Sequence, residues 1–220
     1  MSKILESSGT LRRQPVLGDE PATTIRPLMP NDLGFLYAMH LRLSAQSLYY
    51  RYLQYRTPSW DELATICHLP LETGEALVAT RSGDEEQIIG LAYYVCEAVS
   101  RVPTAELAIL VEDRFQGQGI GRRLWQQMHQ RAQAQQIHRL RVLFDPGNQR
   151  ILHLIKSSGY AYRGSTEGDL NEFIVRLDEQ PQRTQTSQRF SKFGGAFLQR
   201  ILDRPGLPTR GNAAAVTLCQ

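Results

Sequence analysis

Glycine recurs at alternate positions in the segment Gln116–Gly121, between an apolar run and an amphipathic pattern. The preceding run, Ala105–Val111, is almost wholly apolar, as in a strand covered on both faces. Apolar residues then recur every four positions, which predicts a helix over 119–136. Glycines at such a junction let the backbone approach a ligand closely, and amides at a helix start attract an anion. The segment predicts a diphosphate-binding loop. A tight turn without ligand is the alternative, but it does not require three alternating glycines.

Two other phosphate-binding motifs do not fit this segment. A dinucleotide fingerprint needs a glycine at its sixth position, and counting from Gly117 that position is Arg122. A nucleotide-triphosphate loop needs Gly-Lys followed by Ser or Thr, and no lysine lies between Lys3 and Lys156. Neither a dinucleotide nor a nucleoside triphosphate is therefore the expected ligand.

The rest of the chain alternates between helical and strand-like patterns. Helical spacing and capping residues predict three early helices, which begin near Pro30, at Ser44 and at Trp60. A later helix over 148–158 ends at Gly159, which suits the left-handed residue after a helix. The expected strands cover residues 24–26, 76–80, 87–96, 105–111, 138–144, 160–163 and 171–177. The order predicts one α/β (α+β) domain over residues 23–178.

Composition narrows the class of protein. The chain is 41% hydrophobic and 21% charged, as in globular proteins, and no apolar run approaches the roughly 18 residues of a membrane span. The polar start has no export signal, so a cytoplasmic location is expected. The three cysteines are far apart and lack CxxC or clustered histidine spacing, so we expect neither a disulfide framework nor a metal site.

The two ends differ from the central domain in pattern. Residues 1–22 are polar and unpatterned, which predicts a flexible leader. Residues 179–220 form a basic, polar tail, expected to be disordered, with a possible short amphipathic helix at 189–202. That helix would dock on its own domain or on a partner. Because the positive charge lies in the tail and not on a folded surface with aromatic residues, nucleic-acid binding is not expected.

Gln116, Gly119 and Gly121 match the Gln/Arg-x-x-Gly-x-Gly/Ala signature of the GNAT acetyltransferase superfamily. The order of elements over 23–178 also resembles that family, and Leu43–Leu53 with the apolar strand resembles bacterial protein-lysine acetyltransferases. The resemblance implies a central mixed, mostly antiparallel twisted sheet flanked by helices. It also implies that an acetyl group passes directly from acetyl-CoA to a bound amine, without an acyl-enzyme.

The same resemblance implies which residues bind acetyl-CoA. Backbone amides around Leu110 and Val111 are expected to hold the pantetheine arm and to polarise the thioester carbonyl. Asn148 matches an asparagine that often contacts the coenzyme, and it fits a simple helix cap equally well. The expected diphosphate-binding residues are Gln116, Gly117, Gln118, Gly119, Ile120, Gly121 and Arg122.

Glu106 is the candidate catalytic base. A lysine amine has a pKa near 10.4, so its acceptor site needs a base or a water path to one. Glu106 is the only charged residue in the apolar strand, and it matches the position of the base in lysine acetyltransferases of this superfamily. A glutamate that faces water or pairs with an arginine is the alternative. The tyrosine that many members use as general acid is replaced by Ile155, and Tyr160 nearby is more typical of packing, so no acid is assigned.

Tyr49 and Tyr50 are the candidate acceptor-binding residues, because they lie in the helix that lines the acceptor entrance in the superfamily and because aromatic rings attract a cationic lysine. We expect the acceptor to be a protein lysine. A small amine, or an acyl-CoA-binding module without catalysis, remains the alternative.

Overall fold

The computed structural model describes residues 22–83 and 86–178. The predicted tail, and the predicted leader apart from Ala22, lie outside them. Seven strands and five α-helices occur in the described part of the chain. The strands are β1 (Thr23–Pro27), β2 (Gly74–Arg81), β3 (Gln87–Cys96), β4 (Thr104–Val111), β5 (Arg139–Phe144), β6 (Tyr162–Glu167) and β7 (Leu170–Arg176). The helices are α1 (Leu33–Leu41), α2 (Ala45–Tyr52), α3 (Trp60–Cys67), α4 (Ile120–Ala134) and α5 (Gln149–Ser157), with 3-10 turns η1 (Pro30–Asp32) and η2 (Asp113–Phe115).

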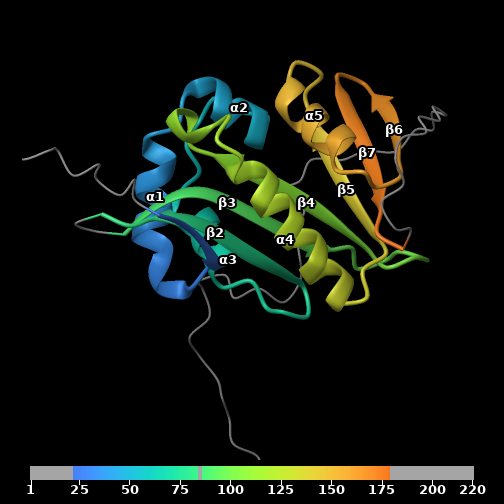
Figure 1. The fold of residues 1–220 in the computed structure, drawn as a ribbon, viewed down its shortest axis with the longest axis horizontal. Helices are drawn as coiled ribbons and strands as arrows, with labels where there is room; N and C mark the ends of the chain where they lie inside the picture. The colour runs from blue at the N-terminus through green and yellow to red at the C-terminus, as the bar shows by residue number, and fades with distance from the viewer. Residues whose placement is uncertain (1–21, 84–85, 179–220) are drawn as a thin grey trace, which may run out of the picture.

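The strands form one mixed sheet in the order β1-β2-β3-β4-β5-β7-β6. The β4–β5 pair is parallel, and the other neighbouring strands are antiparallel. Helices cover both faces: α4 packs across β2, β3 and β4, while α1 packs on β3 and α2 on β4 from the other side. The sequence prediction of an α+β domain with a mixed, mostly antiparallel sheet between helices is confirmed (Figure 1).

β4 and β5 are paired only at the start of β4. Their register runs from Thr104 opposite Arg139 to Glu106 opposite Arg141. Beyond Glu106 the two strands diverge (Figure 1), while β4 continues its pairing with β3 as far as Val111. One edge of β4 is therefore left without a strand partner along its second half.

Local sequence signals explain several element boundaries. The Ser44 side chain accepts a hydrogen bond from the Ser47 amide at the start of α2, as its capping role predicts. Gly159 follows α5 with φ of 80°, which confirms the expected left-handed residue. The largest difference is in β6, which was expected over 160–163: it begins at Tyr162 and runs to Glu167, because its pairing with β7 sets its extent.

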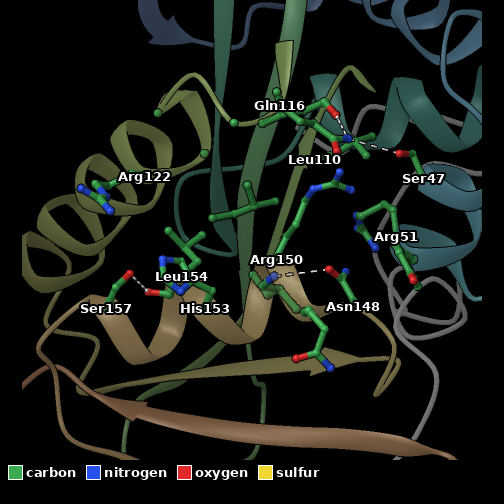
Figure 2. A pocket seen from close by; sticks show the side chains of 18 residues that line it. Ser47, Arg51, Leu110, Gln116, Arg122, Asn148, Arg150, His153, Leu154 and Ser157 are labelled. Carbon is green, nitrogen blue, oxygen red and sulfur yellow. Dashed lines mark hydrogen bonds between the residues drawn. The ribbon is translucent and has the colours of Figure 1, made fainter. Parts of the chain in front are cut away.

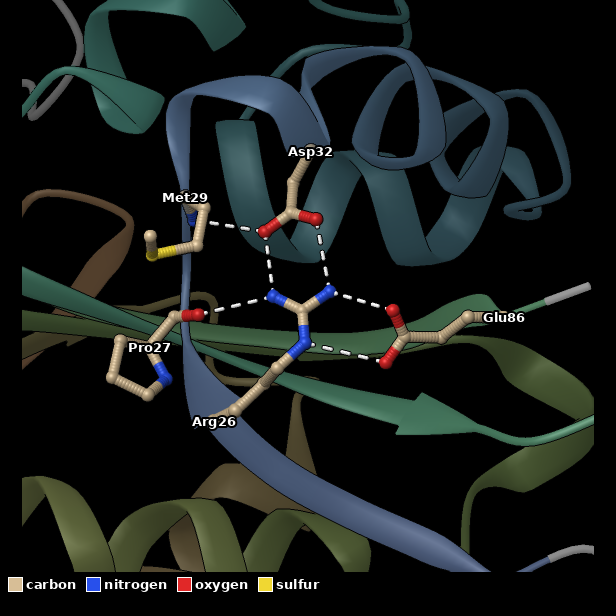
Figure 3. Close-up of polar contacts among 5 residues, drawn as sticks. All are labelled: Arg26, Pro27, Met29, Asp32 and Glu86. Atoms are coloured by element: carbon tan, nitrogen blue, oxygen red, sulfur yellow. Dashed lines mark hydrogen bonds and ion pairs between the residues drawn. The ribbon is translucent and has the colours of Figure 1, made fainter.

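An ion-pair network holds the segment between β1 and α1 in place (Figure 3). Arg26 on β1 donates from Nη1 and Nη2 to the two oxygens of Asp32, at 2.6 and 2.9 Å. Its Nε and Nη2 donate to the carboxylate of Glu86, which precedes β3. Burial alone would raise the pKa of Asp32, but the guanidinium of Arg26 and the amide of Met29 hold it below its usual value.

We expect Arg26→Met to lower the free energy of unfolding by about 3 kcal/mol, because the Asp32 carboxylate would stay buried without its cation. Urea denaturation measures the change. Glu86→Gln is the matched control: its carboxylate is half exposed, so the cost should be under about 1 kcal/mol. Equal losses in the two variants would contradict this asymmetry.

Two histidines are buried on opposite sides of the sheet. The His40 Nδ1 bonds the Leu36 carbonyl at 2.8 Å and therefore carries the proton, so its Nε2 accepts from the Tyr52 hydroxyl at 2.6 Å. The His129 Nδ1 likewise bonds the Trp125 carbonyl, while its Nε2 is buried without a partner. Burial lowers the pKa of each histidine to about 4.

Because these pKa values lie below the unfolded value of 6.5, the unfolded chain binds protons that the folded chain does not bind. Stability should therefore be full above pH 6.5 and fall as the pH drops toward 4, by up to roughly 3 kcal/mol for each histidine. Urea denaturation across this range tests the loss. His129→Gln should flatten the pH dependence, and an unchanged slope in that variant would sink the assignment.

Candidate active site

A pocket of about 660 Å³ opens where β4 and β5 separate (Figure 2). Its volume is within the usual range for small-molecule sites. Residues of α2, β4, the glycine loop, the first turn of α4, and α5 surround it. They are Ser47, Tyr50, Arg51, Ile109, Leu110, Val111, Gln116, Gly117, Gly119, Gly121, Arg122, Asn148, Gln149, Arg150, Ile151, His153, Leu154 and Ser157.

The glycine loop bends through conformations that glycine allows. Gly117 and Gly119 have φ of 78° and 81°, in the left-handed region. Gln116 anchors the loop, since its Nε2 donates to the Val111 carbonyl at 2.8 Å and to Ser47 Oγ at 3.3 Å. The strand end and α2 are thereby joined to the loop.

The start of α4 presents backbone donors to the pocket. Gly119 is its N-cap residue, and the amide of Arg123 bonds the Gly119 carbonyl. The preceding amides of α4 have no intrahelical acceptor, as at the start of every helix. These donors, the helix dipole and the Arg122 side chain all favour an anion here.

The structure brings most of the predicted coenzyme-binding residues together along the pocket: Leu110, Val111, Gln116, Gly117, Gly119, Gly121, Arg122 and Asn148. Gln118 and Ile120 do not line it. The Gln118 side chain donates to the Arg114 carbonyl, and Ile120 is 3% exposed within the core. Any role of these two residues would rest on their backbone. Binding by the whole set stays a prediction.

The position of Asn148 is compatible with both roles considered for it, a helix cap and a contact to the coenzyme. Its Oδ1 accepts from the Ile151 amide at 3.3 Å, so it caps α5, and the residue also lines the pocket. A cap oxygen occupied in this way leaves the side-chain amide as a donor toward a ligand.

Glu106 is 5% exposed and occupies the last β4 position that pairs with β5. It does not line the pocket, whose lining on β4 begins at Ile109, but it lies at the apex of the separation between β4 and β5. It shares a sheet face with Ala108 and Leu110, and this face is covered by α2.

Arg51, Tyr93 and Glu106 belong to one cluster of polar side chains, in which Tyr93 interacts electrostatically with both charged residues. Arg51 extends from α2 over the ring of Tyr93, with its guanidinium carbon 4.9 Å from the ring centroid, and donates to the Tyr93 hydroxyl. Burial and then the negative charge of Glu106 raise the pKa of Tyr93 to about 12, against the opposing effect of Arg51. The base candidate thus lies in a polar cluster, close to a cation.

The candidate acceptor-binding tyrosines differ in position. Tyr50 lines the pocket and donates to the Gly147 carbonyl at 3.1 Å. Tyr49 lies outside the pocket lining, stacks on Tyr55 with 4.6 Å between centroids, and donates to Asp145. Both join α2 to the loop before α5, but only Tyr50 borders the pocket.

The sequence interpretation missed one face of α5. Arg150, His153, Leu154 and Ser157 follow helical spacing and line the pocket together. That spacing was a usable signal. Arg51 was also missed, because nothing in a tyrosine-rich helix distinguishes it before α2 is placed over β4.

Packing explains both Ile155, which stands where many members have the tyrosine acid, and Tyr160 nearby. Ile155 is fully buried in the core between α5 and the sheet. Tyr160 packs against His129, with ring centroids 4.6 Å apart. Neither lines the pocket.

A sequence profile of the acetyltransferase (GNAT) family matches residues 43–160, more than half of the chain. The chain belongs to this family. It is therefore an acyltransferase that uses acetyl-CoA and acts on amines.

Solved structures share the fold of this GNAT domain at low sequence identity. The GNAT domain of S. lividans PAT has a TM-score of 0.64 and 23% identity, over 70% of this chain and 90% of that one. Spermidine N-acetyltransferase from Vibrio cholerae, in complex with CoA and spermine, has a TM-score of 0.57 and 19% identity, over 71% and 96%. The putative acetyltransferase yncA from Salmonella typhimurium, with acetyl-CoA, has a TM-score of 0.53 and 22% identity, over 74% and 99%.

The pocket fits the chemistry of acetyl-CoA. The glycine loop and α4 start offer backbone donors to a diphosphate, and the open edge of β4 offers backbone groups to an amide-containing arm. Within the described part of the chain, no group of three or more His, Cys, Asp or Glu side chains could hold a metal ion. No helix there is long and apolar enough to cross a membrane.

We expect Gly119→Ala to weaken CoA binding about tenfold, because a left-handed φ costs a residue with a Cβ roughly 1–2 kcal/mol. Calorimetric titration with CoA measures the dissociation constant. Gly121→Ala is the matched control: its φ is not left-handed, and an added Cβ would meet Val111 Cγ2 at 3.8 Å, an ordinary contact. Equal weakening in both variants would show that the space taken by the added Cβ, and not the left-handed backbone conformation, determines the loss of CoA binding.

Proposed function

We propose that this GNAT enzyme acetylates lysine side chains of proteins, with Glu106 as the general base. The observation that carries the proposal is the position of Glu106: buried, on the α2 side of β4, at the apex where β4 and β5 part. The local likeness to protein-lysine acetyltransferases and the fold shared with the S. lividans PAT domain support it. A cytoplasmic location stays a prediction.

The base has one task in this mechanism. A lysine amine is almost entirely protonated at neutral pH and must lose a proton before it attacks. Glu106 accepts that proton, directly or through a water molecule. The amine nitrogen then bonds to the acetyl carbon, the carbon–sulfur bond breaks, and the second amine proton leaves while the thiolate gains one.

The second half of β4 positions the reacting group. Its edge toward β5 has no strand partner beyond Glu106, so backbone groups around Leu110 and Val111 face the pocket. Backbone N–H groups fixed in a strand polarise a carbonyl without reorganising, as in an oxyanion hole. Gln116 holds this strand end in place through the Val111 carbonyl.

The proposal includes no dedicated acid for the departing thiolate. Ile155 replaces the expected tyrosine and is buried away from the pocket. A free thiol has a pKa of about 8.5, so the thiolate is a stable enough leaving group for a dedicated acid to be unnecessary.

Glu106→Gln should reduce kcat for lysine acetylation by at least about a hundredfold and leave the dissociation constant for CoA within about twofold. Purified enzyme, acetyl-CoA and a deacetylated host lysate are combined, and acetyl-lysine is quantified by mass spectrometry. Glu75→Gln is the control, since this carboxylate pairs with Arg131 of α4 on the other side of the sheet and should leave kcat unchanged.

Two other outcomes would be decisive. If wild type and variant both bind CoA and neither modifies any lysine, the protein acceptor is wrong, and a panel of small amines separates a small-molecule enzyme from a binding module. If the variant keeps full kcat, Glu106 is a structural carboxylate.

A further inference from the structure

Two arginines reach the end of the pocket that borders α2. Arg51 comes from α2 itself, and Arg150 comes from the first turn of α5. Figure 2 shows the Arg150 side chain extending from α5 across the pocket toward Leu110, on the side where Arg51 and Ser47 lie. We call Arg51 and Arg150 the acceptor-end arginines.

Arg51 lies on α2, and in Figure 2 Arg150 extends to the part of the pocket near Leu110, Ser47 and Gln116, the first residue of the predicted diphosphate loop. Arg122 lies on α4 at the other end of the pocket in Figure 2. Arg51 contacts Tyr93 on the same sheet face as Glu106, which is the face where the proposed base must meet its amine. Arg51 is therefore placed on the acceptor side, and Arg150 extends toward the same side of the pocket.

The acidic residues near this end already have partners in the protein. Asp113 accepts from Ser44 and Ser47, and Asp145 accepts from the Tyr49 hydroxyl and the Gly147 amide. Glu112 pairs with Arg42 and Arg114. Among the described residues, no aspartate or glutamate lines the pocket. An acceptor with several cationic groups would meet Arg150 and Arg51 here, with Glu106 as the carboxylate on the same sheet face.

We propose that the acceptor carries a negative charge beside its reactive amine, and that Arg150, with Arg51, binds this group as a specificity site. This inference rests on the proposed function, and the acceptor it specifies is a lysine with aspartate or glutamate next to it in the protein substrate. A guanidinium binds a carboxylate through two parallel hydrogen bonds, which fixes the position of the neighbouring amine as well as adding attraction.

The proposal also explains how the enzyme would distinguish acidic acceptors from basic ones. Like-charge contacts reject a wrong partner as effectively as good contacts select the right one. A lysine flanked by arginine, or a polyamine, is repelled by the acceptor-end arginines, whereas a lysine flanked by acids is attracted. The cation beside Glu106 is thus compatible with an amine acceptor, because the acceptor supplies an anion of its own.

The test uses three peptides that differ only in the residues flanking one lysine: aspartate, serine or arginine. Wild-type enzyme should show a kcat/KM about tenfold higher for the aspartate peptide than for the serine peptide, and lower still for the arginine peptide. Arg150→Gln should remove the preference, and Arg150→Lys should retain part of it, while the KM for acetyl-CoA changes little. Arg122→Gln, at the loop end, should raise the KM for acetyl-CoA and keep the preference.

Three results would overturn the inference: equal rates for the three peptides, a preference for the arginine peptide, or an Arg150→Gln variant that raises the KM for acetyl-CoA and keeps the peptide preference. Free lysine and lysine amide, which differ in one carboxylate, separate this inference from the proposed function. If no peptide is acetylated but free lysine is preferred over its amide, the protein acceptor fails and the anion site stands. If spermidine is the best acceptor, the anion site fails.

Discussion

β4 pairs with β5 from Thr104 to Glu106 and then loses that partner, while its bonds to β3 continue to Val111. A strand in the middle of a sheet normally has its backbone groups satisfied on both sides. Here one edge of a central strand is open toward a pocket, and the glycine loop, α4 and α5 are arranged around that opening. The pocket, and with it the proposed coenzyme site and the position of the proposed base, depends on this separation of two strands.

Charge is distributed unevenly across the opening. Carboxylates near it are used to cap helices, to bond loop amides or to pair with arginines outside the pocket, as Asp113 and Glu112 show. Arginines, in contrast, point into it. Such a pocket favours anionic partners, and the proposed base, Glu106, lies near Tyr93, whose pKa its negative charge helps to raise.

Much of this architecture follows from local sequence. The glycine loop lies between a strand and a helix as its flanking patterns predict, and Ser44 and Gly159 occupy the helix boundaries that helix physics assigns to them. The extent of β6 and the pocket-facing roles of Arg51 and Arg150 did not follow, because they depend on strand register and on how α2 and α5 approach β4. Such contacts join residues that are far apart in the chain, so no pattern within one element reveals them.

The tyrosines of α2 form a second connection between the two parts of the sheet that separate at β4 and β5. Strand pairing joins its two parts at the apex, and Tyr50 with Tyr49 joins α2 to the Gly147 and Asp145 loop at the opposite end. The two parts of the sheet are therefore connected at both ends of the strand separation. A site whose walls are already connected loses little conformational entropy when a ligand binds.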